Sequence, residues 1–94
     1  MDKKKQLIDQ LKVVINNLEK VYSNEITSGV FQLIYIRYKN ALDVMENNED
    51  IREVNIIGGV RAYMDSYNDY LNSLLGELHK AEKLNGELFI IEKV

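Results

Sequence analysis

Few side chains in this sequence could take part in catalysis, and they are not spaced as an active site requires. His79 is the only histidine and there is no cysteine, which excludes disulfides, thiolate chemistry and cysteine-ligated zinc. A general acid or metal ligand on a helix needs partners three or four residues away, and around His79 only Glu82 is suitable. We therefore expect His79 to be a solvated residue near a helix end, and we predict no catalytic, metal-binding or cofactor-binding residues.

Two other segments could suggest a ligand, but neither has the required pattern. The acidic stretch 43–54 has Asn48 and Val54 where a calcium-binding EF-hand needs glycine at its sixth and glutamate at its twelfth position. The pair Gly58-Gly59 lacks both the further glycine of a dinucleotide fingerprint and the Gly-Lys-Ser/Thr ending of a P-loop. We expect a capping loop in the first case and a hinge or close helix crossing in the second.

The tyrosines are the better candidates for a functional surface. Tyr63, Tyr67 and Tyr70 recur on one face of a predicted helix, interleaved with acidic and amide residues. Tyrosine combines a large contact area with a polar tip, which suits a partly wet interface. Together with Phe89 they form our candidate interaction surface. The alternative is that these rings pack in the core and extend only their hydroxyls to water.

Helices must position these residues, because apolar side chains recur at spacings of three and four over most of the chain. That period allows a helix to bury one face, and it predicts helices over about 3–22, 27–46 and 59–84. The second stripe covers a wider arc, which implies contact on two sides. The third stripe consists of Ile57, Val60, Met64, Tyr67, Leu71, Leu74 and Leu78.

The pattern allows more than one set of boundaries for the third helix. A loop is predicted over 46–50, followed by a capping box from Asp50 to Glu53. Gly58-Gly59 then either separates a short element over 51–57 from the third helix or kinks one long helix, and we favour a short helical lead-in. Asn85-Gly86 predicts a helix end. The residues after it are rich in β-formers and predict an extended strand or arm.

These elements predict an all-α fold, a small antiparallel three-helix bundle with room for a short extra helix before the third. The bundle would occupy residues 1–85, and residues 86–94 would form an extended C-terminal tail. By helical rise, the third helix with its lead-in would be longer than the other two. The surplus length is a reason to expect self-association.

Composition narrows the classes of partner and the compartment. The net charge of −3 argues against nucleic-acid binding, which usually needs a basic face. The stretch from Ile26 to Ile36 is the longest apolar-leaning one without a charge, and it is too short to span a membrane. The basic run Lys3–Lys5 is not followed by the apolar region of a signal peptide. We expect a cytoplasmic protein with a protein partner.

The sequence therefore favours a non-enzymatic helical protein-protein interaction module that self-associates. An immunity- or antitoxin-like protein is the alternative. It would be a stable monomer that neutralises one partner protein through an acidic surface near 46–53. An enzyme would instead need a pocket in which Arg37 and a second cation converge.

Overall fold

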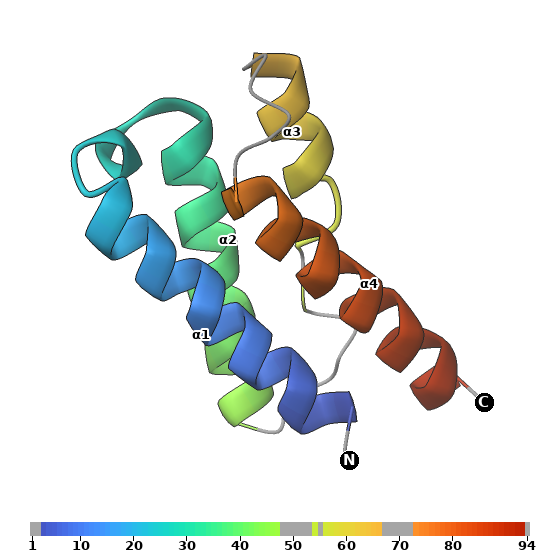
Figure 1. The fold of residues 1–94 in the computed structure, drawn as a ribbon. Coiled ribbons are helices and arrows are strands. Elements are labelled where there is room, and N and C mark those ends of the chain that lie inside the picture. The colour runs from blue at the N-terminus through green and yellow to red at the C-terminus, as the bar shows by residue number, and fades with distance from the viewer. Residues whose placement is uncertain (1–2, 48–53, 55, 67–72, 94) are drawn as a thin grey trace.

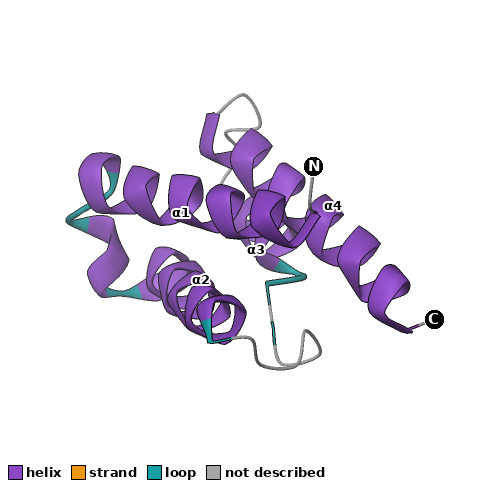
Figure 2. Ribbon diagram, turned by 90° about the horizontal axis from the view of Figure 1, so that it is seen from below, coloured by secondary structure: helices purple, strands orange, loops and turns teal. Residues whose placement is uncertain are grey.

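The computed structural model describes residues 3–47, 54, 56–66 and 73–93, and over these residues it contains only helices and loops (Figure 2). The α-helices are α1 (Lys3–Val21), α2 (Gly29–Glu46), α3 (Gly59–Ser66) and α4 (Ser73–Lys93). A single turn of 3-10 helix, η1 (Glu25–Thr27), lies between α1 and α2. The all-α prediction is confirmed for the described part of the chain, but the expected count of three helices is not.

The first two helices lie close to their predicted positions and run antiparallel. Two pairs of side chains join them at opposite ends of the contact. The Tyr35 hydroxyl donates to the Glu19 carboxylate at 2.6 Å, and Lys12 lies 3.6 Å from the Glu46 carboxylate. Because residues increase along α1 as their partners decrease along α2, the two chain directions are opposite.

Helix α4 covers another side of α1, also antiparallel to it. The Lys3 ammonium is 3.0 Å from the Glu87 carboxylate, and the Gln10 side-chain amide donates to the backbone carbonyl of Glu77 at 3.0 Å. The four helices therefore run alternately up and down, as Figure 1 shows. Within the described ranges, none of them combines the length and apolar character needed to cross a bilayer.

The prediction of one helix over about 59–84 is wrong. Its start at Gly59 is right, but α3 ends at Ser66 and α4 runs in the opposite direction from Ser73 (Figure 1). A continuous apolar stripe was misleading because each of two successive helices needs the same period. Two members of that stripe, Ile57 and Met64, are in fact exposed. Residues 54 and 56 are not helical, and the predicted loop and capping box lie mostly outside the described residues.

The predicted helix end at Asn85-Gly86 and the extended tail are also wrong, because α4 continues to Lys93. The reason is packing. Leu88 is buried on the same face of α4 as Leu78 and Ala81. Burial of that face stabilises the helix by more than a glycine in its interior costs, which is about 1 kcal/mol.

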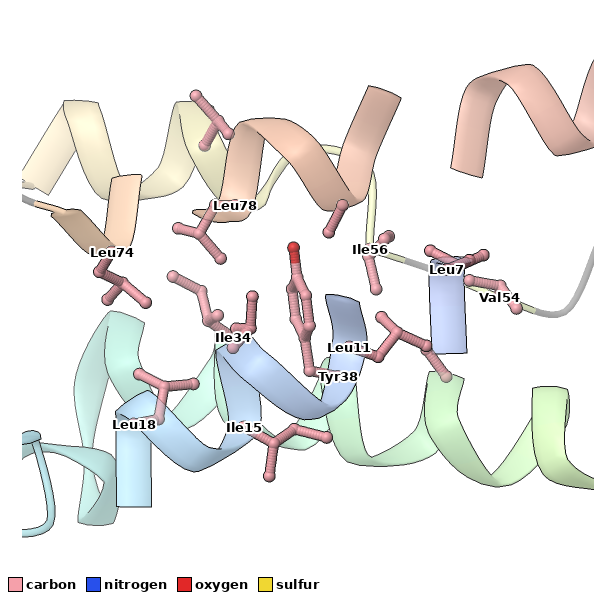
Figure 3. Close-up of a cluster of buried hydrophobic side chains, with 14 of the residues drawn as sticks. Leu7, Leu11, Ile15, Leu18, Ile34, Tyr38, Val54, Ile56, Leu74 and Leu78 are labelled. Carbon is pink, nitrogen blue, oxygen red and sulfur yellow. The ribbon is translucent and has the colours of Figure 1, made fainter. Parts of the chain in front are cut away.

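All four helices contribute to one apolar core. Figure 3 shows its centre, where the Tyr38 ring of α2 lies among side chains of α1, α4 and the segment before α3. The fully buried large side chains are Leu7, Leu11, Val14, Leu18, Ile34, Tyr38, Met45, Ile56, Tyr63, Leu74 and Leu78.

Candidate interaction surface

The structure places the first of the predicted interaction residues in the core. The Tyr63 side chain is only 2% exposed. Its ring meets the Phe31 ring edge to face with centroids 5.9 Å apart, and Phe31 stacks on Tyr22 at 4.7 Å. Such aromatic pairs stabilise a core beyond the apolar area they bury. Tyr63 therefore joins α3 to α2 and is not on the surface of this fold.

The other predicted surface residues are not brought together by the described structure. Tyr67 and Tyr70 lie outside the described residues, and Phe89 lies in α4 with a side chain that is likewise not described. The acidic stretch expected of an immunity-like protein, 46–53, is also largely outside them.

The most unusual polar arrangement is a carboxylate at the start of α3. Glu82 of α4 accepts a hydrogen bond from the Gly58 backbone N–H at 3.3 Å and another from the Val60 N–H at 2.7 Å. The first N–H groups of a helix have no partner inside the helix, and the helix dipole favours a negative charge there. Glu82 thus acts as an N-terminal cap supplied by a different helix.

The phenol of Tyr38 lies close to this carboxylate. In Figure 3 the Tyr38 hydroxyl points away from α2 toward α4 and Ile56, and it has no hydrogen-bond partner among the described residues. Burial raises the pKa of Tyr38 far above its usual range, and the negative charge of Glu82 raises it further. The hydroxyl therefore stays protonated.

Little in this arrangement matches the chemistry of an active site. A general acid or base works best with a pKa near the ambient pH, which Tyr38 does not have. The Glu82 oxygens already accept backbone hydrogen bonds, and His79 is exposed on α4. Among the described residues there is no group of three or more His, Cys, Asp or Glu that could hold a metal ion.

A shallow groove lies between α1 and α4. It encloses about 340 Å³, and its lining is Lys3, Gln10, Lys80, Lys83, Leu84 and Glu87. Two of its lysines are already paired, Lys3 with Glu87 and Lys80 with Glu77 at 3.3 Å. The groove is also wide open to solvent, so it is poorly shaped to enclose a small ligand.

The outer face of α2 carries two of the exposed large apolar side chains among the described residues. Leu33 is 42% exposed and Ile36 is 49% exposed, one helical turn apart. The sequence did contain a signal for this surface, namely the wide apolar arc over 27–46. We interpreted that arc as contact with two neighbours inside the chain. In the structure α1 and α3 cover much of it, but Leu33 and Ile36 remain outside.

These features define a small protein whose described part is entirely helical and closes around one core. The chain belongs to the YeeD family, because residues 1–89 match the family described as YeeD uncharacterised protein. It is 30% identical over 92 residues to the Uncharacterized protein YeeD of Bacillus subtilis (strain 168). The matched region covers 89% of this chain and 90% of that protein. No solved structure matches the chain.

Proposed function

We propose that this protein is a non-enzymatic interaction module that self-associates through the outer face of α2. The observation that carries the proposal is the exposed pair Leu33 and Ile36. The inner face of the same helix is already filled by Phe31, Ile34 and Tyr38, so the outer pair is surplus to the core. Removing each half-exposed side chain from water would contribute about 1 kcal/mol.

The polar residues around this pair suit contact between identical surfaces. Lys39 and Asp43 are exposed on α2 about one and two turns beyond Ile36, and they carry opposite charges. A face with both signs of charge does not repel its own copy as a single-sign face would. In a two-fold arrangement each copy would contribute the same residues, so two leucines and two isoleucines would meet.

Because the apolar pair is small, we expect the affinity of the dimer to be low. Stable interfaces usually involve 20 to 30 residues from each partner. Four apolar side chains give only a small apolar centre, from which the entropic cost of association must be subtracted. We expect a weak, reversible dimer with a dissociation constant on the order of 1 mM.

The absence of catalysis is part of the proposal and is supported by the side chains best able to do chemistry. Glu82 caps the start of α3, the Tyr38 hydroxyl is buried, and His79 is exposed to solvent. The net charge of −3 gives no support to a nucleic-acid partner. The cytoplasmic location expected from the sequence remains a prediction that a fluorescent fusion would check.

Sedimentation equilibrium over 10 µM to 1 mM protein tests the proposal. We expect the average mass of the wild-type protein to rise with concentration. Substitution of both residues, Leu33→Gln with Ile36→Gln, should abolish the rise, because glutamine keeps the helix propensity but removes the apolar contact. The helical circular dichroism of the variant should remain that of the wild type.

The matched control is Val13→Gln on α1, since Val13 is 43% exposed and lies outside the proposed interface. This variant should associate like the wild type. A wild-type mass that stays monomeric up to 1 mM would reject self-association and would favour the immunity- or antitoxin-like alternative, for which a stable monomer is expected. If the control and the double variant lose self-association equally, the assignment of the interface to α2 is rejected.

A further inference from the structure

Helix α3 is too short to be stable without its neighbours. It has eight residues, about two turns, whereas an isolated helix in water needs roughly 12 to 15 residues to be even marginally stable. It packs against α2 and α4. Its conformation therefore depends on contacts with those two helices.

The apolar contacts of α3 come from one side of the helix. Tyr63 packs on Phe31, and Val60 is largely buried beside it. Gly59 faces the same side, because a Cβ added there would be in ordinary contact with its neighbours, 3.6 Å from the Glu82 carboxylate and 4.0 Å from both Ile34 and Tyr38. Together these residues cover part of α2.

At its first turn α3 makes a polar contact with α4. Both oxygens of Glu82 are used there, one by Gly58 N–H and one by Val60 N–H. Gly58 has φ +103°, a conformation that glycine adopts readily and other residues do not. This turn brings two backbone donors to a single carboxylate, so Glu82 attaches the start of α3 to α4.

The remaining helices are joined by contacts that do not involve α3. Helix α1 is tied to α2 through Tyr35 and Glu19, and to α4 through the Lys3–Glu87 ion pair and the hydrogen bond from Gln10. Leu7, Leu11, Val14 and Leu18 fill the space between these three helices. The unit of α1, α2 and α4 can therefore stay folded when α3 leaves.

We propose that α3 is a detachable segment, that Glu82 is the latch that holds it closed, and that it opens as a unit without unfolding of α1, α2 and α4. Opening breaks the two hydrogen bonds to Glu82 and separates the Tyr63 and Phe31 rings. It uncovers Phe31, Ile34 and the hydroxyl-bearing edge of Tyr38. This conformational step is independent of the self-association proposed for the outer face of α2.

Hydrogen exchange of backbone amides, followed by NMR, tests the latch. The Ala62 amide, which donates to the Gly58 carbonyl at 2.9 Å, reports on α3, and the amides of Leu11 and Leu78 report on the unit beneath it. In the wild-type protein we expect Ala62 to exchange through an opening that is at least tenfold more populated than the opening of Leu11 and Leu78.

The variant Glu82→Ala should increase exchange at Ala62 by about 10- to 100-fold, the factor expected for loss of a hydrogen bond to a charged acceptor. Exchange at Leu11 should change less than threefold. Alanine maintains α4, because its helix propensity is the highest of all residues. Glu82→Gln should have a smaller effect, since glutamine keeps one acceptor oxygen.

The matched control is Glu87→Ala, which removes another glutamate of α4 whose partner is Lys3 of α1. It should leave Ala62 exchange unchanged relative to Leu78. The proposal is overturned if wild-type Ala62 exchanges only at the rate of Leu11, or if Glu82→Ala accelerates all three amides equally. If the alanine variant fails to fold, the comparison of Ala62 with Leu11 and Leu78 in the wild-type protein still tests whether α3 opens separately.

Discussion

The Tyr38 hydroxyl is a buried polar group that the described structure leaves without a hydrogen-bond partner. Burying such a group costs free energy, and phenylalanine fills the same space without that cost. We predict that Tyr38→Phe raises the free energy of unfolding by about 1 kcal/mol at pH 7. Urea denaturation followed by circular dichroism measures this change. A loss of stability would show that the hydroxyl has a partner and that its removal is costly.

The same substitution has a second consequence at alkaline pH. Because the pKa of Tyr38 is raised in the folded protein, the unfolded chain releases this proton at lower pH than the folded one. Its contribution to stability is constant well below pH 10, about the unfolded value, and falls as the pH rises above it. Wild type should therefore lose more stability between pH 9 and 11 than Tyr38→Phe. The other tyrosines are common to both proteins, so the difference isolates Tyr38.

At the scale of elements, the expected and observed folds differ at Gly86, where the sequence predicts the end of a helix. The structure places it inside α4 with nothing within 4 Å of an added Cβ. We predict that Gly86→Ala stabilises the protein by about 0.5 to 1 kcal/mol, because alanine loses less backbone entropy in a helix. Thermal unfolding followed by circular dichroism measures the gain. The contrast is Gly58→Ala, which should destabilise the protein because φ at Gly58 is +103°. If Gly86 ended the helix as the sequence indicated, alanine there would also be destabilising.

Periodicity predicted which segments are helical, but not where the third segment divides. The buried residues of α1 follow its predicted apolar stripe closely, whereas the wider arc of α2 also contains the exposed residues Leu33 and Ile36. The third stripe could not show a reversal of direction, since spacings of three and four continue through it. The use of Glu82 as a cap for α3 was also invisible in the sequence. Glu82 and Val60 are 22 positions apart along the chain, and only the packing of α3 against α4 brings them together.

At the scale of the whole molecule, Tyr63 shows where prediction of a surface from residue type fails. Tyrosine suits wet interfaces, yet the Tyr63 ring lies in the core. Side-chain type alone cannot separate a buried ring from an exposed one, since both occur at helical spacing. The sequence signal for exposed apolar surface is the excess of apolar residues in α2 over what its neighbours cover. Leu33 and Ile36 are what remains of that excess.

The core that all four helices share should make unfolding cooperative. Leu11 is fully buried on α1, between α2 and α4. We predict that Leu11→Ala lowers the free energy of unfolding by about 3 kcal/mol, from the lost apolar burial and the cavity left behind. Far-UV circular dichroism should report this loss for the helices, and tyrosine fluorescence should report the same midpoint for the core, because the chain has no tryptophan. Loss of α3 alone would shift the fluorescence while leaving most of the helical signal. Coincident transitions in Leu11→Ala but separated ones in Glu82→Ala would therefore distinguish the shared core from the segment that detaches.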